Sequence, residues 1–227
     1  MSSNRVPAIF VSALPSETPD RYIAHQGMRN AERIGEFLAK QGFRDMCYYC
    51  GTTTDGLMTS LGIMHGVGIA HAGAVRVCQE LCDWRVGEGM YQLTDHRWDE
   101  LVAFAKERGV DPREAVLSPD FNHGLLQTFW EISAQTAEFV RQSVGNRPGV
   151  PNLFVSYTGA RLEWAFMRLL GLRNVQELGF RFIPGEVAVL DFIIPDYMSG
   201  NAFNGQYYDE MLRGLVPALR CLGNALS

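Results

Sequence analysis

Long apolar runs, clustered basic residues and a signal-peptide pattern are all missing from this sequence. No apolar stretch reaches the roughly 20 residues that a membrane-spanning helix needs. The segment MSSNRVPAIFVSAL is too short in its apolar part and too poorly flanked for a signal peptide. The 20 basic and 25 acidic side chains are interspersed and give a formal charge of −5, with no basic stripe for a phosphate backbone. We therefore expect a cytoplasmic protein that binds neither membranes nor nucleic acid.

Cysteine and histidine are few, and their spacing is poor for a metal ion. Five cysteines, an odd number, fit reduced intracellular thiols better than a disulfide framework. Cys47 and Cys50 form a CxxC, but in the apolar run DMCYYC a strand would point them to opposite faces of a sheet. The five histidines show neither HExxH nor any paired spacing. We expect no metal site and no cofactor.

What the sequence does contain is an alternation of buried strands and amphipathic helices. A chain of 227 residues with 47% hydrophobic content can bury a full core, and we expect one domain spanning residues 1–227. The pattern predicts an α/β fold, a three-layer α/β/α sandwich with a mostly parallel central sheet. Strands are predicted at 6–12, 45–50, 74–78, 151–156 and, around Pro184-Gly185, twice within 180–195. The main helices are predicted at 26–40, 56–64, 97–109, 125–144 and, with a kink at Pro217, 207–226.

In open sheets of this kind the ligand crevice lies outside the carboxyl ends of the strands. The segments that follow the predicted strands are therefore the ones to search for function. They are residues 12–14, residues 51–55, the segment after 74–78, and residues 157–158.

Those segments resemble the signature regions of the histidine phosphatase superfamily, the phosphoglycerate mutase-like proteins, over most of the chain. AIFVSALPSE is similar to the first strand and its RHGE motif, and IAHQGMRNAERIGEFLAKQGF to the helix that follows in the family. CGTTTDGLMTS resembles the SPLxRAxxTA segment, and LCDWRVGEGMYQLT the LxExxxGxxEGLT segment. LFVSYTGARLEWAFMRLLGL is similar to VVSHGxxIRxLxxxLLGL nearly residue for residue.

The reactive positions of the family are the ones that differ. The resemblance implies an arginine and a phosphoacceptor histidine on the first loop, a second arginine on the second loop, a glutamate acid, and a histidine on the last loop. These positions read Ser12, Ala13, Asp55, Asp83 and Tyr157. With the second loop shifted by one residue, Thr54 takes the arginine position, which also restores no cation. Ala13 carries no nucleophile, so a phosphohistidine cannot form there.

The hypothesis that follows is acid/base catalysis by Asp55, Asp83 and Tyr157. Two carboxylates held close together do not ionise together easily, so one can act as acid and the other as base, while Tyr157 donates a hydrogen bond or a proton. Each residue also has a structural interpretation: an N-cap for Asp55, a surface turn for Asp83, and filled volume for Tyr157. The residues that we expect to bind substrate are Ser12, Ala13, Thr54, His123 and Thr158.

Three functions compete at this stage. The first is an enzyme, repurposed for biosynthesis, that acts on an uncharged or cationic small molecule by isomerisation, elimination, cyclisation or hydrolysis. The second is a pseudophosphatase that binds a metabolite or a protein without turnover. The third, an active phosphatase or mutase, is nearly excluded by the residue changes. A homodimer is one assembly that we consider for the chain, and the substrate is left open.

Overall fold

The structure is a computed structural model. It describes residues 4–14, 25–70, 74–81, 85–86, 89–90, 95–115, 118–122, 125–147, 149–156, 159–173, 175–194 and 217–226. Within these ranges, no helix is both long enough and apolar enough to cross a membrane.

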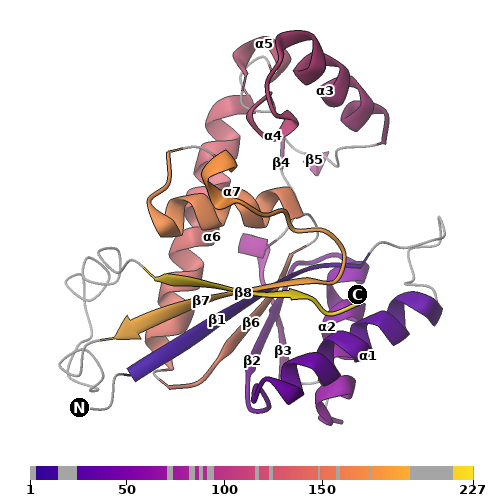
Figure 1. Cartoon of the computed structure of the whole chain (residues 1–227), viewed down its shortest axis with the longest axis vertical. Helices are drawn as coiled ribbons and strands as arrows, with labels where there is room; N and C mark the ends of the chain where they lie inside the picture. The colour runs from indigo at the N-terminus through magenta and orange to yellow at the C-terminus, as the bar shows by residue number, and fades with distance from the viewer. Residues whose placement is uncertain are drawn as a thin grey trace.

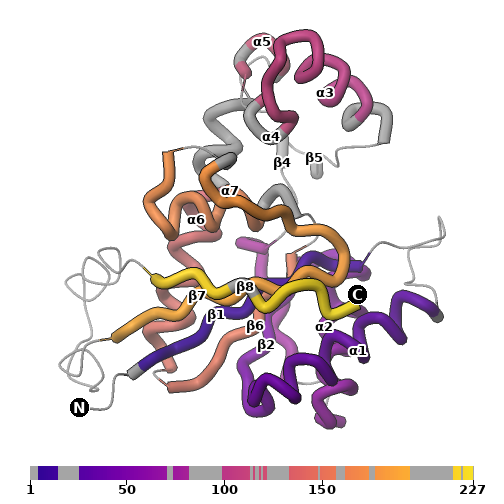
Figure 2. Tube along the Cα trace, viewed as in Figure 1, coloured from indigo at the N-terminus to yellow at the C-terminus, as the bar shows by residue number. Residues whose placement is uncertain are grey.

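A six-stranded sheet forms the centre of the fold (Figure 1). In spatial order its strands are β3 (Val75–Val77), β2 (Cys47–Cys50), β6 (Asn152–Ser156), β1 (Asn4–Ser12), β7 (Glu186–Ile194) and β8 (Ala218–Asn224). The first four are parallel to one another, and β7 runs antiparallel to both of its neighbours. Strands from the two ends of the described chain, β1 and β8, flank β7 (Figure 2). The prediction of a mostly parallel central sheet is confirmed.

Two pairs of helices cover the two faces of this sheet and make three layers (Figure 1). The helices α1 (His25–Lys40) and α2 (Thr54–Val67) cover one face, and α6 (Leu125–Asn146) and α7 (Gly159–Leu170) cover the other. Successive strand residues serve opposite layers: Ile9 packs with the first pair and Phe10 with the second. The predicted three-layer sandwich is therefore confirmed.

The same alternation separates the two cysteines of the CxxC. Cys50 is buried in the core beneath α1 and α2, whereas Cys47 packs against the core of the opposite face. Neither forms a disulfide. The expectation that they point to opposite faces is confirmed, and they cannot act as one chelating pair.

The remaining described elements are short or lie outside the sheet. The helix α3 (Asp95–Arg108) lies beyond α7 as seen from the sheet (Figure 1). Its residues Leu101 and Ala105 are buried and join the core of the α6 and α7 layer. The other elements are η2 (Gln79–Leu81), β4 (Arg85–Val86), β5 (Gly89–Met90), α4 (Pro112–Ala115), α5 (Pro119–Asn122) and η3 (Val175–Leu178).

The prediction of a helix at 207–226 is wrong for residues 217–226, the part of this segment that the structure describes. From Ala218 the chain forms β8, an edge strand antiparallel to β7, while residues 207–216 lie outside the described ranges. Pro217 has no backbone N–H, and its ring would clash with the preceding turn of a helix, so a helix that continues through residue 217 is disfavoured. The apolar spacing that suggested a helix instead reflects a strand with a register shift against Val187/Ala188.

Of the two strands predicted around Pro184-Gly185, only the second exists as β7. Residues 180–182 have no regular structure, and their aromatic side chains pack on one another instead of entering the sheet. The rings of Phe180 and Phe182 lie 5.4 Å apart, and both contact Phe166 of α7 edge-on. The aromatic residues that suggested a strand here serve the packing against α7, and the segment pairs with no strand among the residues that the structure describes.

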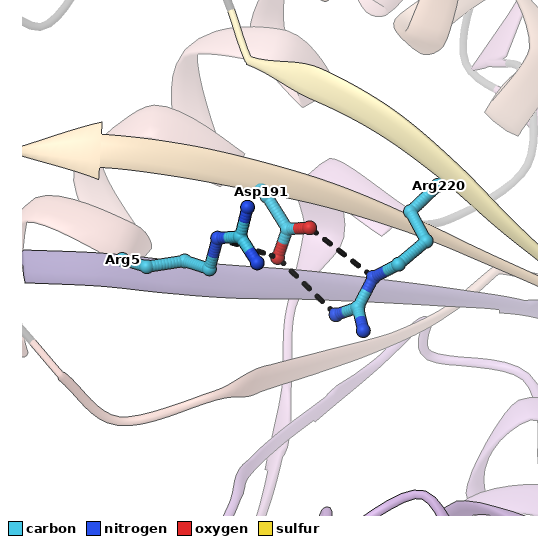
Figure 3. Close-up of polar contacts among 3 residues, drawn as sticks. All are labelled: Arg5, Asp191 and Arg220. Carbon is cyan, nitrogen blue, oxygen red and sulfur yellow. Dashed lines mark hydrogen bonds and ion pairs between the residues drawn. The ribbon is translucent and has the colours of Figure 1, made fainter. Parts of the chain in front are cut away.

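A buried carboxylate ties the three strands of the antiparallel half together (Figure 3). Asp191 on β7 is 3% exposed and lies between Arg5 of β1 and Arg220 of β8. Arg220 contacts both carboxylate oxygens, with Nε 3.1 Å from Oδ2 and Nη2 3.3 Å from Oδ1. The Arg5 Nε lies 3.9 Å from Oδ1. These diagonal cross-strand contacts fix the position of β8 on the edge of the sheet.

The buried hydroxyl of Tyr48 is expected to make the stability of the fold sensitive to alkaline pH. Tyr48 is 1% exposed, and burial, followed by the charge of Asp45, raises its pKa to about 12. An unfolded tyrosine ionises near pH 10, so stability is lost as the pH rises from about 10 through about 12, by up to roughly 2–3 kcal/mol. Tyr48→Phe should remove this part of the loss. Urea unfolding of both proteins at pH 9 and pH 11.5 measures it, and an equal loss in both would contradict the assignment.

Candidate functional site

The parallel strands end together, which brings the predicted segments to one edge of the sheet. Ser12 of β1 pairs with Ser156 of β6, and Cys50 of β2 pairs with Val155 of β6 and Val77 of β3. The backbone bonding continues one residue past β1 and β2, because Ala13 N donates to Ser156 O at 2.7 Å and Gly51 N donates to Val155 O at 3.1 Å. The loops after these strands therefore begin side by side.

The first loop is buried and is anchored to α2. Ser12 and Ala13 are each 5% exposed, and Leu14 is 2% exposed. The backbone N–H of Leu14 donates to Thr59 Oγ1 at 3.0 Å, and Thr59 has no exposed surface. Ala13 contributes only a methyl group at the place where the resemblance implies a nucleophile. Residues 12–14, the part of the first loop that the structure describes, thus supply shape and backbone to the site, and Ser12 supplies the one side-chain hydroxyl among them.

The second loop enters α2 through a regular cap. Thr53 is the N-cap, with extended backbone, and its Oγ1 accepts a hydrogen bond from Gly56 N at 3.2 Å. Thr54 is exposed, whereas Asp55 is 8% exposed. The interpretation of Asp55 as the N-cap is therefore wrong, because Thr53 has that role. Asp55 still lies in the first turn, where the helix macrodipole favours a negative charge.

Asp55 and Thr59 lie one turn apart on the buried side of α2. Residues four apart on a helix are neighbours on one face, so the Asp55 carboxylate belongs to the same face as the hydroxyl that holds the first loop. Thr59 is not among the site residues predicted from the sequence. The signal that could have found it is a polar residue four positions after Asp55, on the same face of the predicted helix.

Two further side chains hold the segment that leads toward Asp83. Ser156, fully buried at the end of β6, donates from Oγ to Leu81 O at 3.4 Å. Thr136 of α6 donates from Oγ1 to Glu80 O at 2.7 Å. The short helix η2 is thereby fixed beside the end of β6. Neither serine nor threonine was singled out from the sequence, since isolated hydroxyl residues carry no recognisable pattern.

The structure places half of the predicted site residues. Ser12, Ala13, Thr54 and Asp55 are brought to the same edge of the sheet by the register and the hydrogen bonds given above. Asp83, His123, Tyr157 and Thr158 lie outside the described residues. Their parts in the site remain predictions.

The electrostatic character of the described loops is set by one acid. Neither residues 6–20 nor residues 45–75 contain a lysine or an arginine, so the first two loops provide no cation. No group of three metal-ligating side chains occurs among the residues that the structure describes. The arrangement can bind and orient through backbone and hydroxyl groups, and can exchange a proton through Asp55.

Comparison with known proteins finds likeness in structure only. No family model and no curated protein matches the sequence. A solved structure named Mycobacterial hydrolase 2 is 15% identical with a TM-score of 0.64, covering 96% of this chain and 89% of its own. A mycobacterial glucosyl-3-phosphoglycerate phosphatase with inorganic phosphate is 13% identical with a TM-score of 0.59, covering 98% of this chain and 99% of its own. A putative alpha-ribazole-5′-P phosphatase from Escherichia coli is 15% identical with a TM-score of 0.59, covering 97% of both chains.

Two of these structural neighbours are named as phosphatases, and the likeness spans nearly the whole chain. The phosphoglycerate mutase-like fold predicted from the sequence is therefore confirmed. At this level of identity the likeness establishes the fold, and activity has to be argued from the site itself.

Proposed function

We propose that this chain, built on the phosphoglycerate mutase-like fold, has lost phosphohistidine chemistry and acts as an acid/base catalyst. Its substrate would be an uncharged or cationic small molecule, and its reaction an isomerisation, elimination, cyclisation or hydrolysis. The observation that carries the proposal is the pair of residues at the shared strand edge: buried Ala13 on the first loop and buried Asp55 on the second. An alanine cannot be phosphorylated, and an aspartate in place of an arginine cannot hold a phosphate.

The electrostatic balance supports this reading. A phosphate charge about 4 Å from the Asp55 carboxylate would be repelled by about 4 kcal/mol at an effective dielectric constant of roughly 20. The N-terminus of α2 would return only about 0.3–1 kcal/mol to an anion. The repulsion exceeds the attraction, so a neutral or cationic ligand is favoured in the first two loops.

In the proposed reaction Asp55 exchanges the proton. Asp83 would be the second carboxylate and Tyr157 the hydrogen-bond donor to a developing oxyanion. Two nearby carboxylates share one proton more readily than they both ionise, which provides an acid and a base in one site. Ser12, Thr54, His123 and Thr158 would orient the substrate. The buried first loop, fixed by Thr59, would keep water away from one side of it.

Non-catalytic binding is the second candidate. The burial of Ser12, Ala13 and Leu14 favours it, since these three residues present almost no side-chain surface to a reacting group. In that case the chain would be a pseudophosphatase that binds a metabolite or a protein partner.

Phosphatase chemistry should be absent. We expect the purified protein to release no p-nitrophenolate from p-nitrophenyl phosphate above the blank rate, and to acquire no phosphohistidine when incubated with phosphorylated metabolites. Phosphohistidine-specific antibodies and mass spectrometry of the intact protein check the second point. A phosphorylated protein would overturn the loss of this chemistry.

The acid/base role is tested by turnover of small molecules in a cell extract. The extract is incubated with wild type, Asp55→Asn or Asp45→Asn, and its metabolites are compared by mass spectrometry. We expect a substrate–product pair whose conversion falls about 100-fold in Asp55→Asn, as is usual for the loss of a general acid or base. The exposed Asp45 is the matched control and should leave the rate within about twofold. Equal conversion by wild type and Asp55→Asn would exclude the role of Asp55.

A further inference from the structure

A cavity of about 470 Å³ lies between α6 and α7. Such a volume is typical of small-molecule sites. It lies near the C-terminal end of α7, roughly 18 Å along the helix axis from the N-terminus that faces the candidate site. Its walls are Ala134, Ala137, Glu138, Arg141, Met167, Arg168, Gly171 and Leu172. The cavity is therefore separate from the strand edge that carries the candidate site.

Two arginines from different helices meet in this wall. Arg168 of α7 donates from Nε to Ser133 Oγ of α6 at 3.1 Å, which orients its guanidinium across the seam between the helices. Burial, and next the positive charge of Arg141, lower the pKa of Arg168. Among the lining residues that the structure describes, Glu138 is the one acidic group, so these residues have a net charge of +1, from two arginines and one glutamate.

The C-terminus of α7 in the wall is capped, so it opposes a negative ligand less than an uncapped helix end would. Gly171, at a φ of 68°, and Leu172 close the C-terminus of α7. Their N–H groups donate to Arg168 O at 3.4 Å and Met167 O at 2.9 Å. Two of the last four carbonyls of α7 are thus already hydrogen-bonded, which reduces, without removing, the partial negative charge that the helix end presents to the cavity.

We propose that this cavity is a second ligand site, which binds a small carboxylate with an apolar body. The carboxylate would lie between Arg141 and Arg168, where a guanidinium forms short charge-assisted hydrogen bonds. The apolar body would pack on the half-buried Ala134 and Leu172, next to the buried Ala137 and Met167. A monoanion suits the wall better than phosphate, because the net charge is a single positive one and Glu138 would repel a dianion.

The test follows the methyl group of Met167, which is 2% exposed in the cavity wall. The protein is labelled with ¹³C at its methionine methyl groups, and Met167→Leu assigns the signal. We expect 4-phenylbutyrate to shift this signal saturably, while 4-phenylbutan-1-ol and inorganic phosphate do so at least about tenfold more weakly. That difference corresponds to the loss of one charge-assisted contact. Equal shifts from the alcohol, or no shift from the carboxylate at tens of millimolar, would overturn the proposal.

Variants separate the proposed contacts from general charge. Arg168→Met and Arg141→Met should each weaken 4-phenylbutyrate binding about tenfold or more. Glu138→Gln should strengthen it, since it removes the negative charge from the wall. Arg29→Met, on the exposed side of α1 in the other helix layer, should leave it unchanged. If Arg168→Met fails to fold, the Arg141→Met result decides, and unchanged binding there would exclude the site. Asp55→Asn affects none of these readouts, so the outcome is independent of the proposed catalysis.

Discussion

Replacement of Gly66 by alanine is expected to lower the free energy of unfolding by about 3 kcal/mol or more. A Cβ atom at this position of α2 would lie 2.0 Å from the backbone oxygen of Glu32 in α1. A backbone atom cannot move aside by changing a rotamer, so the two helices would have to separate. Alanine is the better helix former by about 1 kcal/mol, which offsets only part of the loss.

The helices α1 and α2 approach each other closely along the whole line of their contact, which we call the seam. A Cβ atom on Gly35 would lie 2.1 Å from Ile63 O, and one on Gly62 would lie 2.5 Å from the Ala31 Cβ. Glu36→Ala, at an exposed position of α1, is the control and should change stability by less than about 0.5 kcal/mol. Urea unfolding of the wild type, Gly66→Ala and Glu36→Ala measures their free energies of unfolding. A Gly66→Ala protein as stable as the wild type would show that the helices can part without cost.

This packing also concerns the site. The helix α2 carries Asp55 and Thr59, and Thr59 holds the first loop through the backbone of Leu14. A displacement of α2 away from α1 therefore displaces the acid and the anchor of the first loop together. The glycines of the seam set the position of the helix, and the helix sets the position of the carboxylate.

The layers of the fold were predictable because burial leaves a clear periodic signal. In β1 the alternation of Ile9 and Phe10 between two cores, and in α1 the spacing of Ala31, Ile34 and Leu38, follow directly from strand and helix geometry. The edge strand β8 was not predictable in this way. Its exposed and half-buried residues alternate poorly, and its pairing with β7 depends on contacts about 30 residues away, such as that between Asp191 and Arg220.

The site was predictable to the extent that topology fixes it. Residues that directly follow parallel strands reach the same edge, so Ser12, Ala13, Thr54 and Asp55 could be grouped from the sequence. Thr59 and Ser156 could not, because their roles depend on which backbone group lies opposite each hydroxyl. That is decided by the packing of loops and helices, and no local pattern in the sequence records it.

Replacement of Arg220 by methionine is expected to cost about 3 kcal/mol. Asp191 has a side chain that is 4% exposed, and without Arg220 its carboxylate would keep only the contact with Arg5 at 3.9 Å. A buried charge that has lost its main partner is strongly destabilising. Methionine retains an apolar stem near the ring of Phe43, over which the Arg220 guanidinium lies at 5.5 Å. The loss therefore reports mainly on the charge.

The double variant Asp191→Leu/Arg220→Met should regain most of that stability, because an apolar pair replaces an ion pair whose carboxylate is buried and whose arginine is 40% exposed. Arg5→Met, at a side chain that is 56% exposed, should cost less than about 1 kcal/mol. Urea unfolding of the three proteins forms the comparison. If the double variant were as unstable as Arg220→Met, the arginine would be needed for packing on β8 and not for the Asp191 carboxylate. The expected recovery would instead mean that this ion pair specifies where β8 joins the sheet, while adding little to the free energy of the fold.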